Sequence, residues 1–66
     1  MNEKREWRVG DVFEYINQRH APEMFGHIGI VIGFRDTFLD TKWVTKNSKY
    51  SPVYPENAKF LTHIDE

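Results

Sequence analysis

The sequence predicts a small all-β domain of about five short strands that close, or nearly close, into a barrel. The central observation is the run Gly26–Phe34, the most apolar stretch of the chain, which carries three glycines. Short apolar runs recur on both sides of it, separated by turn residues, and this spacing is typical of small barrels. Closure would also remove exposed sheet edges, which a chain of 66 residues has little else to cover.

The size and composition of the chain limit the possibilities further. We expect one domain over residues 7–66, preceded by a charged, frayed segment at residues 1–6. Such a domain buries only about 60% of the surface that its unfolded chain exposes. The absence of cysteine excludes a disulfide scaffold and thiolate metal sites. No apolar run is long enough to span a membrane, and the charged N-terminus does not resemble a secretory signal, so we expect a cytoplasmic location.

The central run is predicted to be a buried strand with two different faces. Side chains alternate along a strand, so one face carries large residues and the other carries small ones. The large ones are Ile28, Ile30, Ile32 and Phe34, and the small ones are Gly29, Val31 and Gly33. The glycine spacing matches neither the dinucleotide-binding nor the Walker pattern, which favours close packing over a phosphate-binding role.

The part of the chain before this run predicts a strand and then a long loop. The strand covers Trp7–Ile16, where β-forming residues are interrupted by the turn signal Gly10-Asp11. A helix over Asp11–Arg19 is the alternative, although its Val, Phe, Tyr and Ile residues are mediocre helix formers. The loop covers Asn17–Phe25, because its proline cannot donate a ladder hydrogen bond.

After the central run, the sequence predicts a turn, two further strands, a short extended piece and one helical turn. A third strand over Phe38–Lys46 follows the polar turn Arg35-Asp36-Thr37. An extended piece at Tyr50–Tyr54 precedes Pro55-Glu56-Asn57, where the proline begins a single 3₁₀ turn. The last strand covers Phe60–Ile64, with three residues expected on one face, namely Phe60, Thr62 and Ile64.

This layout resembles the SH3-like small barrels, and within them the KOW-type and photosystem-accessory-subunit-type domains. Val9–Phe13 is similar to their opening strand, Phe25–Val31 to the glycine loop and strand of KOW segments, and Tyr54–Leu61 to their helical turn and last strand. The resemblance implies a five-stranded SH3-like barrel with a short 3₁₀ turn before the last strand. The family includes binding modules for RNA and for proteins, and a shared fold does not choose between them.

The basic side chains of the middle segment form one candidate binding site. The net charge is −1, yet residues 27–50 carry four basic and two acidic side chains. If Trp43 faces the core, Lys42 and Lys46 flank an exposed Val44 and, with Lys49, form a basic ridge. Such a ridge suits phosphate groups or an acidic protein surface, whereas its simplest role is that of a solvated face.

Aromatic and apolar residues near two loops form the other candidate site. The resemblance implies that binding occurs at the first loop and beside the helical turn. The residues at these two places are Pro22, Met24 and Phe25 in the loop and Tyr50 and Tyr54 near the turn. Tyrosine and methionine are favoured at protein interfaces. Met24 and Phe25 are also candidates for a lid over the core.

Catalytic and metal-binding patterns are weak in this sequence. No serine has a placed base beside it, and Ser48 and Ser51 are better explained as turn residues. The possible metal ligands are His20, Glu23, His27 and His63, which show no metal-ligand spacing. We therefore expect no enzyme activity, cofactor or metal.

Two functional hypotheses follow. The first is a non-catalytic binding module that docks onto a larger protein, of a size suited to a small accessory protein or a phage-type modulator of a host complex. The alternative is a KOW-like nucleic-acid-binding module that uses Lys42, Lys46 and Lys49.

Overall fold

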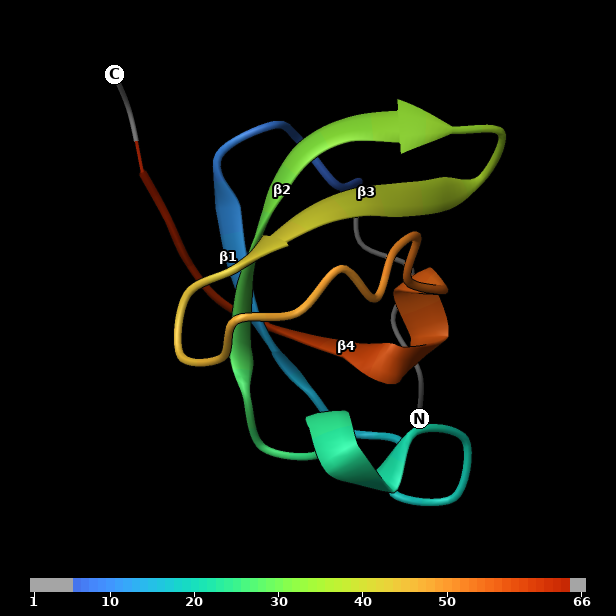
Figure 1. Ribbon diagram of the computed structural model, residues 1–66. Helices are drawn as coiled ribbons and strands as arrows, with labels where there is room; N and C mark the ends of the chain where they lie inside the picture. The colour runs from blue at the N-terminus through green and yellow to red at the C-terminus, as the bar shows by residue number, and fades with distance from the viewer. Residues whose placement is uncertain (1–5, 65–66) are drawn as a thin grey trace.

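The computed structural model describes residues 6–64, which form one antiparallel sheet with two short 3₁₀ turns (Figure 1). The strands of the described residues are β1 (Asp11–Tyr15), β2 (Ile28–Arg35), β3 (Phe38–Trp43) and β4 (Ala58–His63), and the turns are η1 (Pro22–Met24) and η2 (Pro55–Asn57). The strand order is β3-β2-β1-β4. The all-β class and the 3₁₀ turn before the last strand are thus confirmed. None of the helical turns in residues 6–64 is long or apolar enough to cross a membrane.

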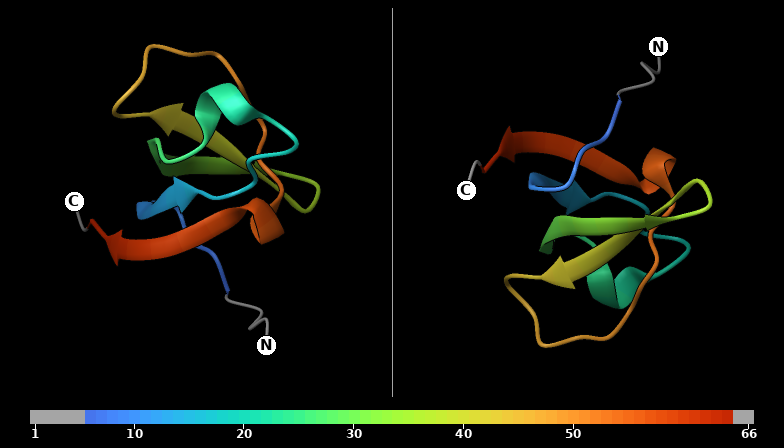
Figure 2. Two further views of the ribbon diagram at one scale, coloured as in Figure 1. Left: turned by 90° about the horizontal axis from the view of Figure 1, so that it is seen from below. Right: turned by 90° about the horizontal axis from the view of Figure 1, so that it is seen from above.

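The described strands number four and form an open sheet, so they do not close into the five-stranded barrel that the sequence predicts. β3 and β4 lie at opposite edges of the sheet, which both views of Figure 2 show. The piece predicted at Tyr50–Tyr54 contributes only an isolated bridge, in which Val53 exchanges backbone hydrogen bonds of 2.8 and 2.9 Å with Leu39. Pro52 and Pro55 flank this bridge and have no N–H to donate, so the pairing cannot extend into a full strand.

The first strand is shorter than predicted, and the alternative helix is not formed. β1 begins at Asp11 because Gly10 has a φ of +99°, which ends the extended backbone. Phe13 pairs with Gly29 on one side and with Phe60 on the other, and this pairing on both sides defines the segment as a strand. Residues 1–5 lie outside the described part of the chain, so the expected fraying there remains a prediction.

The core lies on the face of the sheet that carries the small residues of β2. Gly29 and Val31 are buried, whereas Ile28 and Ile30 on the other face are half-buried, so β2 is fully buried on one face only. Aromatic rings fill the space above Gly29, as Phe13 and Trp43 pack with ring centroids 5.7 Å apart. The buried core residues are Phe13, Tyr15, Ala21, Met24, Val31, Leu39, Trp43 and Val53.

Two register shifts shape the sheet. One lies between Val31 and Gly33 of β2, where Ile32 is the extra residue, so the two faces predicted along the central run hold only as far as Val31 and are wrong beyond it. β2 bends strongly along its length in Figure 1. The other lies between Val12 and Phe13 of β1, where β4 contributes Leu61 as an extra residue. This shift breaks the alternation expected over Phe60–Ile64, so the predicted shared face of its residues is wrong.

The third strand and its preceding turn differ only slightly from the prediction. Asp36 occupies the turn between β2 and β3 with a φ of +56°, a conformation that Asp tolerates better than most residues. β3 ends at Trp43 rather than at Lys46, after which residues 44–52 are irregular.

Candidate functional site

Four aromatic side chains from distant parts of the chain meet at the surface, and we call them the aromatic patch: His20, Phe38, Tyr50 and Tyr54. The His20 ring lies 6.4 Å from the Tyr50 ring and 6.0 Å from the Tyr54 ring, measured between centroids. Phe38 packs edge-on against Tyr54 at 4.7 Å. The patch therefore joins the first loop, the start of β3, the segment after β3 and the residue before η2.

Tyr50 is held by three polar contacts. The indole N–H of Trp43 donates to the Tyr50 carbonyl at 2.6 Å, and the Tyr50 N–H donates to the Ser48 hydroxyl at 3.0 Å. The Tyr50 hydroxyl lies 3.5 Å from the hydroxyl of Tyr15. Because Trp43 and Tyr15 belong to the core, these contacts tie the backbone and the hydroxyl of Tyr50 to the core.

Two asparagines position the first loop against η2. The Asn17 side-chain amide donates to the Asn57 side-chain oxygen at 2.9 Å. The Asn17 side-chain oxygen accepts from the backbone N–H groups of Arg19 and His20 at 3.1 and 2.9 Å, which is an Asx turn. Asn57 is buried, and its carbonyl accepts from the N–H of Ile16 at 2.9 Å. These hydrogen bonds hold the loop in a conformation that places His20 beside Tyr50 and Tyr54.

The remaining two rings are placed by neighbouring turns. Tyr54 precedes η2, and its carbonyl accepts from the N–H of Asn57 at 2.9 Å. Phe38 begins β3 directly after the turn at Asp36 and lies close to the ion pair between Arg35 and Asp40, whose charged atoms are 3.7 Å apart. Tyr54 is 41% exposed, so the patch presents ring surface to solvent.

The polar network beneath the patch includes Tyr15, whose pKa is strongly raised. Burial raises the pKa of the Tyr15 hydroxyl above its ordinary value, and its neighbour Tyr50 raises that pKa further. Asn57 acts in the opposite direction, because its hydrogen bond to Tyr15 lowers this pKa. Tyr15 is therefore a neutral hydroxyl at neutral pH and serves as a structural hydrogen-bonding group.

The structure brings together only part of the partner-binding set predicted from the sequence. Tyr50 and Tyr54 meet through His20. Phe25 is 47% exposed and Pro22 is exposed, but within residues 6–64 neither has a ring contact with the aromatic patch. Met24 is only 1% exposed and is itself a core residue, so it is not available to a partner.

The basic residues lie on β3 and in the irregular segment that leads to Tyr50. Trp43 is buried and Val44 is 63% exposed, which confirms the predicted orientation of this stretch. Lys42 is exposed on β3, and Lys46 and Lys49 lie in the irregular segment after it. Since Trp43 points into the core, its ring is not available to stack on a nucleic-acid base.

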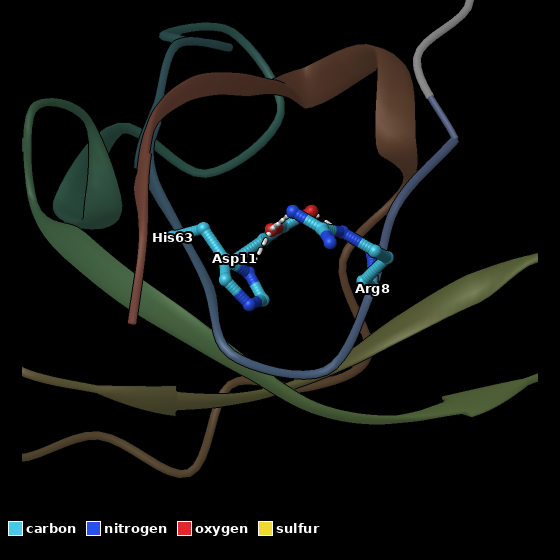
Figure 3. Close-up of polar contacts among 3 residues, drawn as sticks. All are labelled: Arg8, Asp11 and His63. Atoms are coloured by element: carbon cyan, nitrogen blue, oxygen red, sulfur yellow. Dashed lines mark hydrogen bonds and ion pairs between the residues drawn. The ribbon is translucent and has the colours of Figure 1, made fainter. Parts of the chain in front are cut away.

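A second polar cluster is formed by Arg8, Asp11 and His63 (Figure 3). Asp11 is fully buried and lies with one carboxylate oxygen 2.7 Å from Nδ1 of His63. Its other oxygen accepts from the backbone N–H of Arg8 at 2.9 Å, and the Arg8 guanidinium lies 4.0 Å from the oxygen that faces His63. These contacts join the start of β1 to the end of β4. In the described part of the chain, no three His, Cys, Asp or Glu side chains form a group able to hold a metal ion.

Comparisons with protein-family models, with curated proteins and with solved structures find no match for this chain.

Sequence reasoning missed three residues of the patch and its support. His20 was considered only as a metal ligand, and Phe38 only as a strand residue. Asn57 was noted only as part of the helical turn. An asparagine that opens a loop is a known signal for a side-chain turn, so the fixed position of His20 had a local cue in Asn17. The meeting of Phe38 with Tyr54 depends on the fold and had no cue.

Proposed function

We propose that this protein is a non-catalytic binding module that docks onto a larger protein through the aromatic patch. The observation that carries the proposal is that the four partly exposed rings of the aromatic patch contact one another. Hydrogen bonds of Tyr50 and of the first loop support them. Tyrosine rings combine apolar faces with a polar edge, and tyrosine and phenylalanine are enriched at protein interfaces. Their fixed conformation also lowers the entropy that binding would cost.

The finer description of the fold belongs to the same proposal. An SH3-like arrangement is supported by the strand order, by the 3₁₀ turn before β4 and by the bridge at Val53, which continues the sheet beyond β3. In this arrangement the bridge is the remnant of a fifth strand. The aromatic patch then lies where the first loop and the helical turn approach each other.

The proposal is tested by affinity capture from native lysate with nuclease added. We expect wild-type protein to retain a specific protein partner, and we expect Tyr54→Ser to lose most of it, because a truncated interface aromatic often costs 2 kcal/mol or more, roughly a thirtyfold loss of affinity. Val44→Ser is the matched control, since Val44 is exposed and does not belong to the aromatic patch. Equal capture by wild type and Tyr54→Ser would contradict the proposal.

The test also separates protein binding from nucleic-acid binding. If Lys42, Lys46 and Lys49 bind nucleic acid, capture should disappear with nuclease and weaken steeply with salt. Changing all three to Ala should then abolish retention, whereas Tyr54→Ser should have no effect.

A further inference from the structure

His20 gives the aromatic patch a group whose charge can change near neutral pH. Imidazole side chains change charge between about pH 5 and 8, whereas phenol groups ordinarily ionise near pH 10 and Phe38 has no titratable group. The His20 ring lies 6.4 Å from the Tyr50 ring and 6.0 Å from the Tyr54 ring, measured between centroids. Protonation of His20 would therefore place a positive charge directly beside two of the other three rings.

The backbone on both sides of His20 keeps its side chain at the patch. The His20 N–H donates to the Asn17 side-chain oxygen at 2.9 Å, and the next residue, Ala21, is 2% exposed and belongs to the core. His20 thus lies between a side-chain turn and a buried residue. Because this backbone is anchored, a charged His20 would remain against the tyrosines unless its own side chain turned away.

The surroundings of His20 offer no ion-pair partner. The charged side chains of the segments that meet at the patch are Arg19, Glu23, Arg35, Asp40, Lys49 and Glu56. Asp40 is paired with Arg35, and no carboxylate of residues 6–64 lies within ion-pair distance of the His20 ring. Two basic residues, Arg19 and Lys49, are chain neighbours of His20 and Tyr50. A protonated His20 would therefore be stabilised only by water and by the tyrosine rings.

We propose that His20 makes docking at the aromatic patch dependent on pH, an inference that rests on the function proposed above. The partner segment that fits is apolar and uncharged, and it binds while His20 is neutral. A neutral imidazole can be covered together with the neighbouring rings at little cost, whereas an imidazolium loses its hydration and gains no carboxylate. Docking therefore weakens as the pH falls and His20 takes up a proton.

A titration of the full chain followed by NMR tests the first step without a partner. We expect the ring signals of Tyr50 and Tyr54 to shift with the same midpoint as the ring signals of His20. His20→Gln should abolish this shared transition, since glutamine does not titrate. Tyrosine signals that stay constant while His20 titrates would overturn the proposal, because the charge would then not act on the patch.

Affinity capture tests the second step. The protein that the wild-type chain retains from nuclease-treated lysate at about pH 7.5 is measured again at about pH 5.5, near the two ends of the range in which imidazole titrates. We expect wild-type retention to fall by about tenfold or more, because an unpaired charge is costly to bury in an interface. The ratio between the two pH values should be close to one in His20→Gln.

His27→Gln is the matched control. The His27 ring contacts the Thr45 hydroxyl at 2.9 Å and does not belong to the aromatic patch, so this variant should keep the wild-type pH dependence. Equal wild-type retention at both pH values, or stronger retention at the lower one, would overturn the proposal and leave the docking function standing. A pH dependence that persists in His20→Gln would assign it to another group. Absence of any retained protein at either pH would overturn both proposals.

Discussion

At the scale of single residues, Gly29 explains why β2 can lie beneath an aromatic core. The rings of Phe13 and Trp43 occupy the space in which any other residue would carry its side chain. Gly33 lies on the same strand, yet a Cβ there would meet Asp40 only at 3.7 Å, an ordinary contact distance. The two glycines thus have different roles, although they look alike in the sequence.

Alanine substitutions at Gly29 and Gly33 make a matched test of this packing. Gly29→Ala should lower the free energy of unfolding by about 1–3 kcal/mol, because an added methyl in a filled core forces its neighbours apart. Gly33→Ala should leave stability nearly unchanged or raise it slightly, since alanine also reduces the entropy of the unfolded chain. Urea denaturation measures both. Equal effects of the two substitutions would show that the space above Gly29 is not filled as described.

Tyr15 gives the structure a characteristic response to alkaline pH. Its pKa is raised in the folded protein, mainly by burial, so above pH of about 10, the usual tyrosine pKa, the unfolded chain loses a proton that the folded chain keeps. The contribution of Tyr15 to stability is therefore complete below this pH and is lost as the pH rises above it.

We expect the free energy of unfolding of the wild-type protein to fall with pH above about 10, and Tyr15→Phe to show a shallower fall. The variant should be less stable at neutral pH, by about 0.5–1.5 kcal/mol, because it loses the hydroxyl contacts. Urea denaturation at a series of pH values measures both effects. Parallel curves for the two proteins would contradict the assignment of this pH dependence to Tyr15.

At the scale of elements, the contact between Asp11 and His63 fixes β4 to β1. The register shift of β4 at Leu61 weakens the regular pairing, and the buried carboxylate lies just beyond it. Because both carboxylate oxygens have partners, their removal leaves polar groups of the neighbouring segments without an acceptor.

Asp11→Ala should therefore destabilise the protein by about 2–3 kcal/mol. Asp40→Ala is the control, since the ion pair of Asp40 with the exposed Arg35 is partly solvated and contributes about 1 kcal/mol or less. Thermal or urea denaturation compares the two. A change of less than about 1 kcal/mol in Asp11→Ala would mean that the cluster does not hold the last strand.

The elements also show how far sequence reasoning extends. The turn at Pro55 was predicted correctly because a proline at the first helical position is a local signal. The inward orientation of the Trp43 side chain was predicted from strand alternation, which is also a local signal. The register shifts were not predictable, because an extra residue such as Leu61 is defined only by its partner strand. His20 and Phe38 joined the candidate site for the same reason, through contacts between segments far apart in the sequence.

At the scale of the whole molecule, the open sheet presents the aromatic patch at one place on its surface. The patch lies where the first loop, the start of β3 and η2 meet. Closure into a barrel was predicted from strand spacing, but the prolines around Val53 prevent a full fifth strand. We propose that this patch serves a protein partner.

Site-specific photo-crosslinking tests the central claim, docking through the aromatic patch, most directly. The photoreactive residue benzoyl-phenylalanine replaces Tyr54 in the full chain, or Asn47 as a control, and nuclease-treated native lysate is irradiated. We predict that position 54 forms a discrete adduct with a different protein and that position 47 does not. No protein adduct at position 54, or the same adducts at both positions, would contradict the claim that the aromatic patch is the docking surface.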